Sequence, residues 1–95
     1  MLRPEFEDVA YSDFIRVLDF LGNVNPLAGA DLGETLIREI EFLCKNPEVG
    51  RPFPAGDGVR EWIVGFRSTA YIIRYVVKGD MLIILRIWSG REDRP

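Results

Sequence analysis

Histidine is absent from this chain, and cysteine occurs once, as Cys44. The missing imidazole removes the usual general base at neutral pH, a common zinc ligand, and every Ser-His or Cys-His catalytic pair. Cys44 cannot form an intramolecular disulfide, and its place in a helical pattern beside Leu43 predicts a small buried side chain rather than a reactive thiol. We therefore expect no metal site and no cofactor, and any chemistry must use Arg, Lys, Tyr, Ser or carboxylate groups.

Long hydrophobic runs are missing as well. No stretch approaches the roughly 20 consecutive apolar residues that a membrane-spanning helix needs, and the start of the chain lacks the apolar core of a signal peptide. We therefore expect a cytoplasmic protein with no membrane partner. A length of 95 residues, 47% of them hydrophobic and 28% charged, fits a single compact domain over residues 1–95.

Positive charge is scarce in the first half of the chain. Residues 1–50 carry 4 basic and 10 acidic side chains, a net charge of −6, whereas residues 51–95 carry 8 basic and 5 acidic side chains, a net charge of +3. The total of −3 argues against indiscriminate nucleic-acid binding, which needs an excess of Lys and Arg. The arginine-rich half can still contact an acidic partner.

Two amphipathic helices are expected in the first half. Apolar residues recur at helical spacing from Val9 to Leu21, and Gly22-Asn23 predicts the end of that helix. The polar residues Asp13, Arg16 and Asp19 are expected on its solvent side. After a connection of about four residues, Asn25 and Pro26 predict the start of a second helix, antiparallel to the first.

The second helix is expected to end before Asn46-Pro47, because the residue before a proline disfavours the helical region. Its buried stripe is predicted to comprise Ala28, Leu32, Leu36, Ile40 and Leu43, widened by Ile37 and Cys44. Residues 47–58 contain three prolines and are predicted to form a loop without a regular ladder.

Three antiparallel strands are expected in the second half, over Val59–Phe66, Ala70–Val77 and Met81–Trp88. The segment Leu2–Glu7 can add a short strand, which Pro4 restricts to an edge or to its own first residues. The predicted fold class is α+β. Large apolar side chains point to both faces of these strands, yet the helices can cover only one. Either the preceding loop or a partner chain is expected to cover the other face.

Several short motifs follow one another along these elements. Asn25-Pro26-Leu27-Ala28 opens the second helix, and the linker reads Pro47-Glu-Val-Gly50-Arg-Pro52. The strands carry Gly58-Val-Arg60-Glu61-Trp62 and Tyr71-Ile-Ile-Arg74-Tyr75, and Arg86-Ile-Trp88-Ser-Gly-Arg91 follows. In order and spacing these motifs resemble the ParE/RelE family of bacterial toxin–antitoxin toxins, of the plasmid stabilisation type, over nearly the whole chain.

This resemblance implies a toxin that causes growth arrest and is neutralised by a cognate antitoxin, with a heterotetramer as one assembly the pair could form. ParE-like members poison DNA gyrase, whereas RelE-like members cleave messenger RNA on the ribosome. The family commonly has His-Gly-Arg where this chain has Ser89-Gly90-Arg91. A serine hydroxyl does not exchange protons usefully near neutral pH. We therefore expect a gyrase-binding toxin rather than an enzyme.

Two alternatives stay open. The first is a ribosome-dependent mRNA interferase, an endoribonuclease in which Arg60, Arg86 and Arg91 stabilise the charge on the transferred phosphate. The second is a family member that binds its partner and has lost toxicity. The acidic composition and Ser89 favour this second alternative.

An apolar sheet face edged by arginines suits an antitoxin or target segment, because apolar anchors give affinity and arginine–carboxylate pairs give register. The residues expected to contact the antitoxin or the target are Arg60, Trp62, Arg74, Arg86, Trp88, Ser89 and Arg91. For Arg60 and Arg86 the alternative is an internal pair with a carboxylate. For the two tryptophans a core or interface role is favoured over stacking on a nucleic-acid base.

Other candidate residues have simpler readings. Tyr71 and Tyr75 are expected to be core or interface aromatics rather than acid catalysts. Arg91 and Arg94 lie in a polar tail that is expected to be a solvated end, with target contact as the alternative.

The turn at Gly79-Asp80 decides whether two arginines can act together. A two-residue turn pairs Arg74 with Leu85 and sends Arg74 and Arg86 to opposite faces, whereas a three-residue turn puts both on one face. We favour the two-residue turn, so a joint anion site of Arg74 and Arg86 is not expected.

Overall fold

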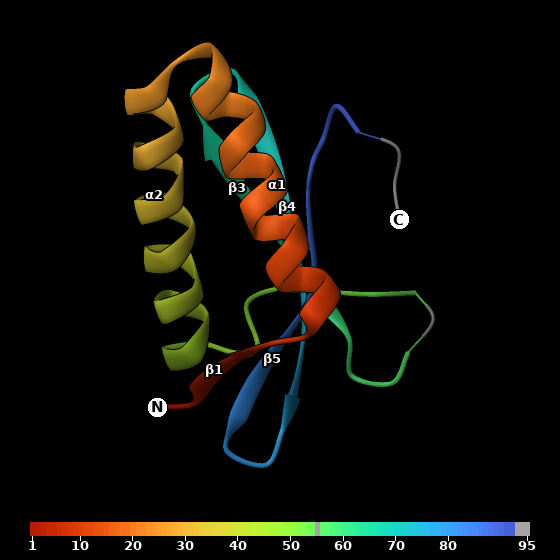
Figure 1. Cartoon of the computed structure of the whole chain (residues 1–95). Helices are drawn as coiled ribbons and strands as arrows, with labels where there is room; N and C mark the ends of the chain where they lie inside the picture. The colour runs from red at the N-terminus through yellow and green to blue at the C-terminus, as the bar shows by residue number, and fades with distance from the viewer. Residues whose placement is uncertain (55, 93–95) are drawn as a thin grey trace.

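The computed structural model describes residues 1–54 and 56–92. Within these residues a helix hairpin lies across one face of a five-stranded sheet, as Figure 1 shows. The elements in chain order are β1 (Arg3–Phe6), α1 (Asp8–Val24), α2 (Pro26–Lys45), β2 (Arg51–Pro52), β3 (Arg60–Phe66), β4 (Thr69–Lys78) and β5 (Met81–Ser89). The strand order is β1-β5-β4-β3-β2, with β1 parallel to β5 and every other pair antiparallel. The predicted α+β class is confirmed.

The turn between the helices is tighter than the sequence predicts. Helix α1 continues through Gly22 and Asn23 to Val24, and a single residue, Asn25, connects it to α2. The predicted stop was wrong because Gly22 serves packing: a Cβ atom on Gly29 would lie 2.8 Å from the Cα atom of Gly22. The Asn25 cap is confirmed, since its Oδ1 atom accepts a hydrogen bond from the backbone N–H of Ala28 at 3.2 Å.

The core forms where the helices meet the sheet. The predicted stripe of α2 is buried, Cys44 included, but Ile37 is 43% exposed, so it does not widen the stripe. Across the interface the buried sheet residues are Val64, Tyr71, Ile73, Tyr75, Leu82, Ile84 and Ile87. Asp13 was predicted on the solvent side of α1, yet it is only 5% exposed. That prediction was wrong because a charged group on β5 and a backbone N–H reach it, as described below.

Both outer strands carry a proline. The expected N-terminal strand is confirmed as β1, where Pro4 lies at one edge of the sheet. At the other edge, Arg51 and Pro52 form β2 opposite Glu61 and Arg60 of β3. The prediction that residues 47–58 lack any ladder was therefore wrong over two residues, because an edge strand needs no N–H from its proline on the solvent side.

The hairpin of β4 and β5 contains an irregularity that the sequence did not reveal. The two-residue turn is confirmed, since Lys78 pairs with Met81. A bulge then shifts the register, so that Arg74 lies opposite Arg86 and not opposite Leu85. The expected pairing of Arg74 with Leu85 was wrong for this reason.

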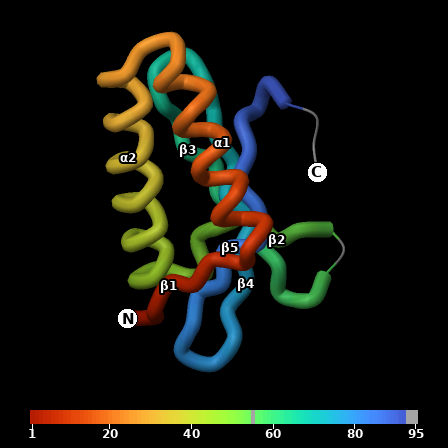
Figure 2. The backbone as a smooth tube through the Cα atoms, in the orientation of Figure 1, coloured from red at the N-terminus to blue at the C-terminus, as the bar shows by residue number. Residues whose placement is uncertain are grey.

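The chain's own loop covers the centre of the sheet face that the helices leave open. The ring of Phe53 lies 4.4 Å from the guanidinium carbon of Arg74, and Val76 and Trp88 are 8% and 3% exposed. Toward the edge of this face, Ile63 remains 54% exposed. Figure 2 shows that residues 90–92, which follow β5, run beside α1. No helix within the described ranges is long and apolar enough to cross a membrane.

Candidate functional site

Three of the arginines expected on a partner surface instead bind acceptors of the same chain. Arg60 donates a hydrogen bond to the backbone oxygen of Gly50 at 2.8 Å. Arg74 binds Glu61, and Arg86 binds Asp13. The alternative of internal pairing with a helix carboxylate therefore holds for Arg86, while Arg60 uses a backbone carbonyl instead.

Arg74 is part of a closed cluster on the loop side of the sheet. Its Nε and Nη2 atoms donate to the same oxygen of Glu61, at 3.1 and 2.9 Å. The guanidinium carbon lies 4.4 Å from the ring centre of Phe53 and 4.8 Å from that of Trp88. The side chains of Arg74 and Glu61 are 14% and 2% exposed. This buried pair, with two aromatic rings on the cation, fastens the loop to the sheet.

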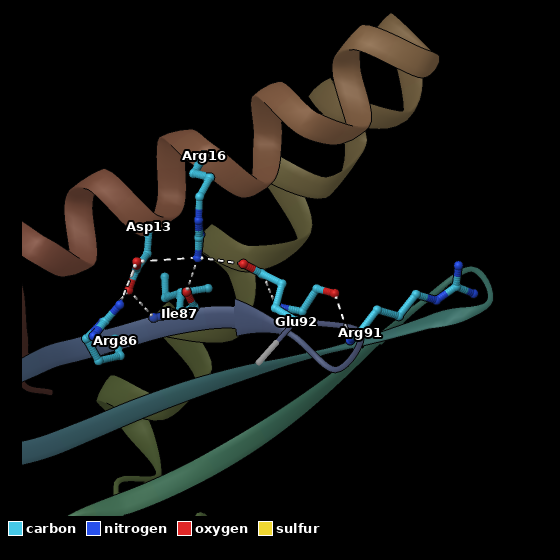
Figure 3. A network of polar contacts seen from close by, with 7 residues as sticks. Asp13, Arg16, Arg86, Ile87, Arg91 and Glu92 are labelled. Atoms are coloured by element: carbon cyan, nitrogen blue, oxygen red, sulfur yellow. Dashed lines mark hydrogen bonds and ion pairs between the residues drawn. The ribbon is translucent and has the colours of Figure 1, made fainter. Parts of the chain in front are cut away.

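Asp13 is the centre of a second cluster, between α1 and β5 (Figure 3). Its Oδ2 atom accepts from the Nε atom of Arg86 at 2.8 Å and from the backbone N–H of Ile87 at 2.9 Å. Its Oδ1 atom accepts from the Nη2 atom of Arg86 at 3.2 Å. The hydrogen bond to Asp13 is the main cause that raises the pKa of Arg86. This contact aligns α1 on β5, because the carboxylate satisfies a backbone donor of the strand.

Arg16 extends this cluster to the C-terminal segment. Its Nη2 atom lies 3.4 Å from Asp13 Oδ1, 3.3 Å from the backbone oxygen of Ile87 and 3.1 Å from Glu92 Oε1. The other carboxylate oxygen of Glu92 accepts from the backbone N–H of Ser89 at 2.6 Å. The hydroxyl of Ser89 accepts from the backbone N–H of Arg91 at 3.0 Å. Glu92 is therefore held against α1, as Figure 3 shows.

A groove of about 410 Å³ lies beside this cluster, between α1 and the adjoining ends of β4 and β5. Its apolar lining includes Phe20, Leu21 and Tyr71, and Arg16 and Ser89 stand at its polar side. Phe20 is 76% exposed although it is a large aromatic residue. We call this feature the α1 groove; it offers an apolar cavity next to a cation and a bound carboxylate.

The aromatic candidates are mostly structural. The indole N–H of Trp62 donates to Glu39 at 3.0 Å, and its ring lies 5.6 Å from that of Phe42 on α2. Trp88 is buried beside Arg74. The hydroxyl of Tyr75 donates to the backbone oxygen of Pro47 at 2.7 Å, and burial raises the pKa of this phenol. These contacts favour the core role that the sequence predicts.

The predicted residues are not gathered at one point. Ser89 and Arg91 line the α1 groove, and Arg91 also reaches the backbone oxygen of Ser68 at 3.5 Å. Arg60 lies opposite Tyr75 of β4, and Tyr75 is seven residues beyond Ser68, which precedes this strand. Arg60 and Ser68 are therefore about 20 Å apart. Arg94 lies outside the described residues. The three arginines of the nuclease alternative therefore do not form a cluster in the part of the chain that the structure describes.

The α1 groove was missed by reasoning from the sequence. The available signal was Phe20, a large aromatic that falls outside the apolar stripe of α1, at a position where a solvated helix face needs none. The roles of Asp13 and Glu92 carried no local signal, because each depends on a residue more than seventy positions away.

Comparison with known proteins identifies the family. The model of the ParE toxin of type II toxin–antitoxin systems, parDE, matches residues 5–94. This chain belongs to that family. Among curated proteins it is 36% identical over 85 residues to Toxin RelE1 of Caulobacter vibrioides, covering 90% of this chain and 89% of the relative. It is therefore a ParE/RelE-family toxin of a type II system, which implies a cognate antitoxin as partner.

Solved structures share the fold of this ParE-family chain. A chain of the chromosomal ParDE system from P. aeruginosa matches with a TM-score of 0.72 and 22% identity, covering 92% of this chain and 94% of that one. The solution structure of a conserved hypothetical protein from Helicobacter pylori matches with a TM-score of 0.52 and 21% identity, covering 97% and 98%. At these identities the likeness describes the fold alone.

Proposed function

We propose that this ParE-family toxin acts by binding DNA gyrase, that its binding stabilises the cleaved gyrase–DNA complex, and that the cognate antitoxin neutralises it. The observation that carries the choice of binding over cleavage is the separate engagement of Arg60 and Arg86. A phosphoryl-transfer site needs several cations converging on one phosphate. Here each of these arginines has its own internal acceptor, and Ser89 stands where the resemblance to the family leads us to expect histidine.

Ribosome-dependent mRNA cleavage is the second candidate. It is kept because the curated relative is named Toxin RelE1, and because Arg91 and Ser89 lie together at the α1 groove. Both candidate targets are found in the bacterial cytoplasm, so we propose that location in either case. A third candidate, a non-toxic family member, differs from both in its effect on cells.

One experiment separates these candidates. The chain is expressed from an inducible promoter without antitoxin, and growth, covalent gyrase–DNA complexes and primer extension on translated messages are followed together. We expect growth arrest with trapped gyrase complexes and uncut messages. Arrest with normal gyrase complexes would overturn the gyrase proposal, and cuts in translated messages would replace it with mRNA cleavage. Unimpaired growth with a folded, abundant protein would point to the non-toxic candidate.

A further inference from the structure

The α1 groove has chemistry that fits one kind of occupant. We propose that it receives a segment of the antitoxin in which a carboxylate adjoins an apolar side chain, and that Glu92 holds the place of that carboxylate in the free toxin. This inference rests on the proposed neutralisation by a cognate antitoxin. Beyond neutralisation itself, we name the surface that binds the antitoxin, the chemistry of the bound segment, and Glu92 as an internal competitor for the same position.

The strongest observation is how the chain binds its own carboxylate. One oxygen of Glu92 lies 3.1 Å from the guanidinium of Arg16, and the other accepts from the backbone N–H of Ser89 at 2.6 Å. An arginine and a backbone N–H directed at the two oxygens of one carboxylate form a receptor for that group. The side chain of Glu92 is 35% exposed, so a partner's carboxylate can replace it without unfolding the toxin.

Arg16 does not depend on Glu92 for its position. The same Nη2 atom lies 3.4 Å from Asp13 and 3.3 Å from the backbone oxygen of Ile87. Asp13 is fixed in turn by Arg86 and by the N–H of Ile87. The cation therefore stays in place when Glu92 leaves, which lowers the entropy lost when a partner binds.

The apolar part of the groove supplies the second element of recognition. Phe20 is 76% exposed, while Val17 and Tyr71 form a buried floor at 4% and 6% exposure. An apolar side chain entering beside Phe20 would remove this surface from water, and the neighbouring carboxylate would meet Arg16. The lining holds two cations, Arg16 and Arg91, and one carboxylate, that of Glu92, so the groove favours an acidic rather than a basic segment.

The first test measures binding of the cognate antitoxin to this toxin by titration calorimetry. Phe20→Ala is expected to weaken binding about tenfold or more, as for a central aromatic contact. Val24→Ala is the matched control, because Val24 is 79% exposed one helical turn away and does not line the groove. Its affinity is expected to stay within about twofold of the wild type.

The second test addresses the competition. Glu92→Ala is expected to tighten antitoxin binding about threefold, since an exposed ion pair of this kind no longer has to be broken. Asp80→Asn, which removes a carboxylate from an exposed pair with Arg3, serves as control and should leave affinity unchanged. Arg16→Ala should weaken binding and abolish the gain from Glu92→Ala in the double variant. A purely structural role of Glu92 would give no gain.

The outcomes separate this inference from the proposed function. If the wild type binds the antitoxin but Phe20→Ala and Glu92→Ala bind as the wild type does, the groove proposal is overturned while neutralisation stands. If Phe20→Ala loses gyrase poisoning but keeps its antitoxin affinity, the groove belongs to the target and the proposal also fails. If the wild type does not bind the antitoxin, both fail. Melting of each variant shows that it is folded.

Discussion

Two buried carboxylates, those of Glu61 and Asp13, help to hold the loop before β3 and the segment after β5 in this toxin, and their cations differ in exposure. On the loop side, Glu61 binds Arg74, whose side chain is 14% exposed and lies between two aromatic rings, and more loosely Arg51, at 3.4 Å. On the tail side, Asp13 binds Arg86 and also Arg16, whose side chain is 42% exposed. We call these clusters the loop attachment and the tail attachment.

The comparison of the two clusters indicates under which conditions an arginine that already binds a carboxylate can also bind a ligand. In the loop attachment the main cation, Arg74, is enclosed, so it contributes to the fold and cannot receive a partner, and the more exposed Arg51 lies 3.4 Å from the same carboxylate. In the tail attachment the inner carboxylate is satisfied by a strand N–H and by Arg86, while Arg16 keeps one side open to Glu92. Counting arginines in a sequence therefore overestimates the cations that a partner can use.

The largest expected effect concerns the loop attachment. Arg74→Met should lower the free energy of unfolding by about 3 kcal/mol or more, because it leaves the Glu61 carboxylate buried without its main cation. Urea denaturation measures the change. The double variant Arg74→Met with Glu61→Gln should recover part of the loss, because the buried charge is removed as well. A loss below about 1 kcal/mol in the single variant would show that the loop attachment is not the tighter of the two.

The tail attachment should respond less to loss of its carboxylate. Asp13→Ala should lower the unfolding free energy by about 2 kcal/mol, mainly because the N–H of Ile87 loses its acceptor. Arg86 and Arg16 can turn toward solvent, so neither becomes a buried unpaired charge. Asp19→Ala, on the same helix, is the control and should change stability by less than about 0.5 kcal/mol. Equal losses for Asp13→Ala and Arg74→Met would remove the contrast between the two clusters.

The helices and strands of this fold can be predicted from local sequence patterns, but the loop attachment and the tail attachment cannot. The periodicity of three to four in α2 and the Asn25-Pro26 start are visible in the sequence because they depend on residues within one turn. The bulge that brings Arg74 opposite Arg86 is not, since either register buries apolar residues of β5. Asp13 looks like a solvated residue until β5, more than seventy residues later, supplies its donors.

The same limit applies to the site. Ser89 and Arg91 were predicted from the sequence and do line the α1 groove, because both follow the last strand. Phe20 and Arg16 were not, since only the packing of α1 over β5 places them beside residues 89–92. Reasoning from the sequence located the arginines but not their partners.

A smaller effect is expected where the loop begins. The Tyr75 hydroxyl donates to Pro47 and accepts from the N–H of Gly50. Tyr75→Phe should therefore lower the unfolding free energy by about 1 kcal/mol at neutral pH. If Tyr75→Phe increases the rate of amide hydrogen exchange more at Gly50 than at Val17, relative to the wild type, the change is located at the loop. An unchanged exchange rate at Gly50 would contradict the prediction.

Alkaline pH offers an independent check on the same tyrosine. Burial raises the pKa of Tyr75 in the folded state above its ordinary value of 10.0. The neutral phenol is favoured in the folded state, and its contribution to the free energy of unfolding is complete below about pH 10. This contribution is lost as the pH rises through the higher pKa of the folded state. Tyr75→Phe should therefore flatten the decline of the melting temperature above pH 10, while burial of Tyr71 leaves some of that decline in place. An unaltered decline would mean that another group causes it.

The smallest expected effect is at the outer end of the tail attachment, and it sharpens the comparison. Glu92→Ala should lower the unfolding free energy by about 0.6 kcal/mol, because its ion pair with Arg16 is partly exposed. Added salt at 1 M should reduce even this difference, whereas the loss caused by Arg74→Met should persist, since solvent ions do not screen an enclosed pair. A salt-independent loss at Glu92 would show that the tail is fixed as firmly as the loop. A carboxylate held so firmly could not give way to a partner, whereas a weak contact to Arg16 is what exchange requires.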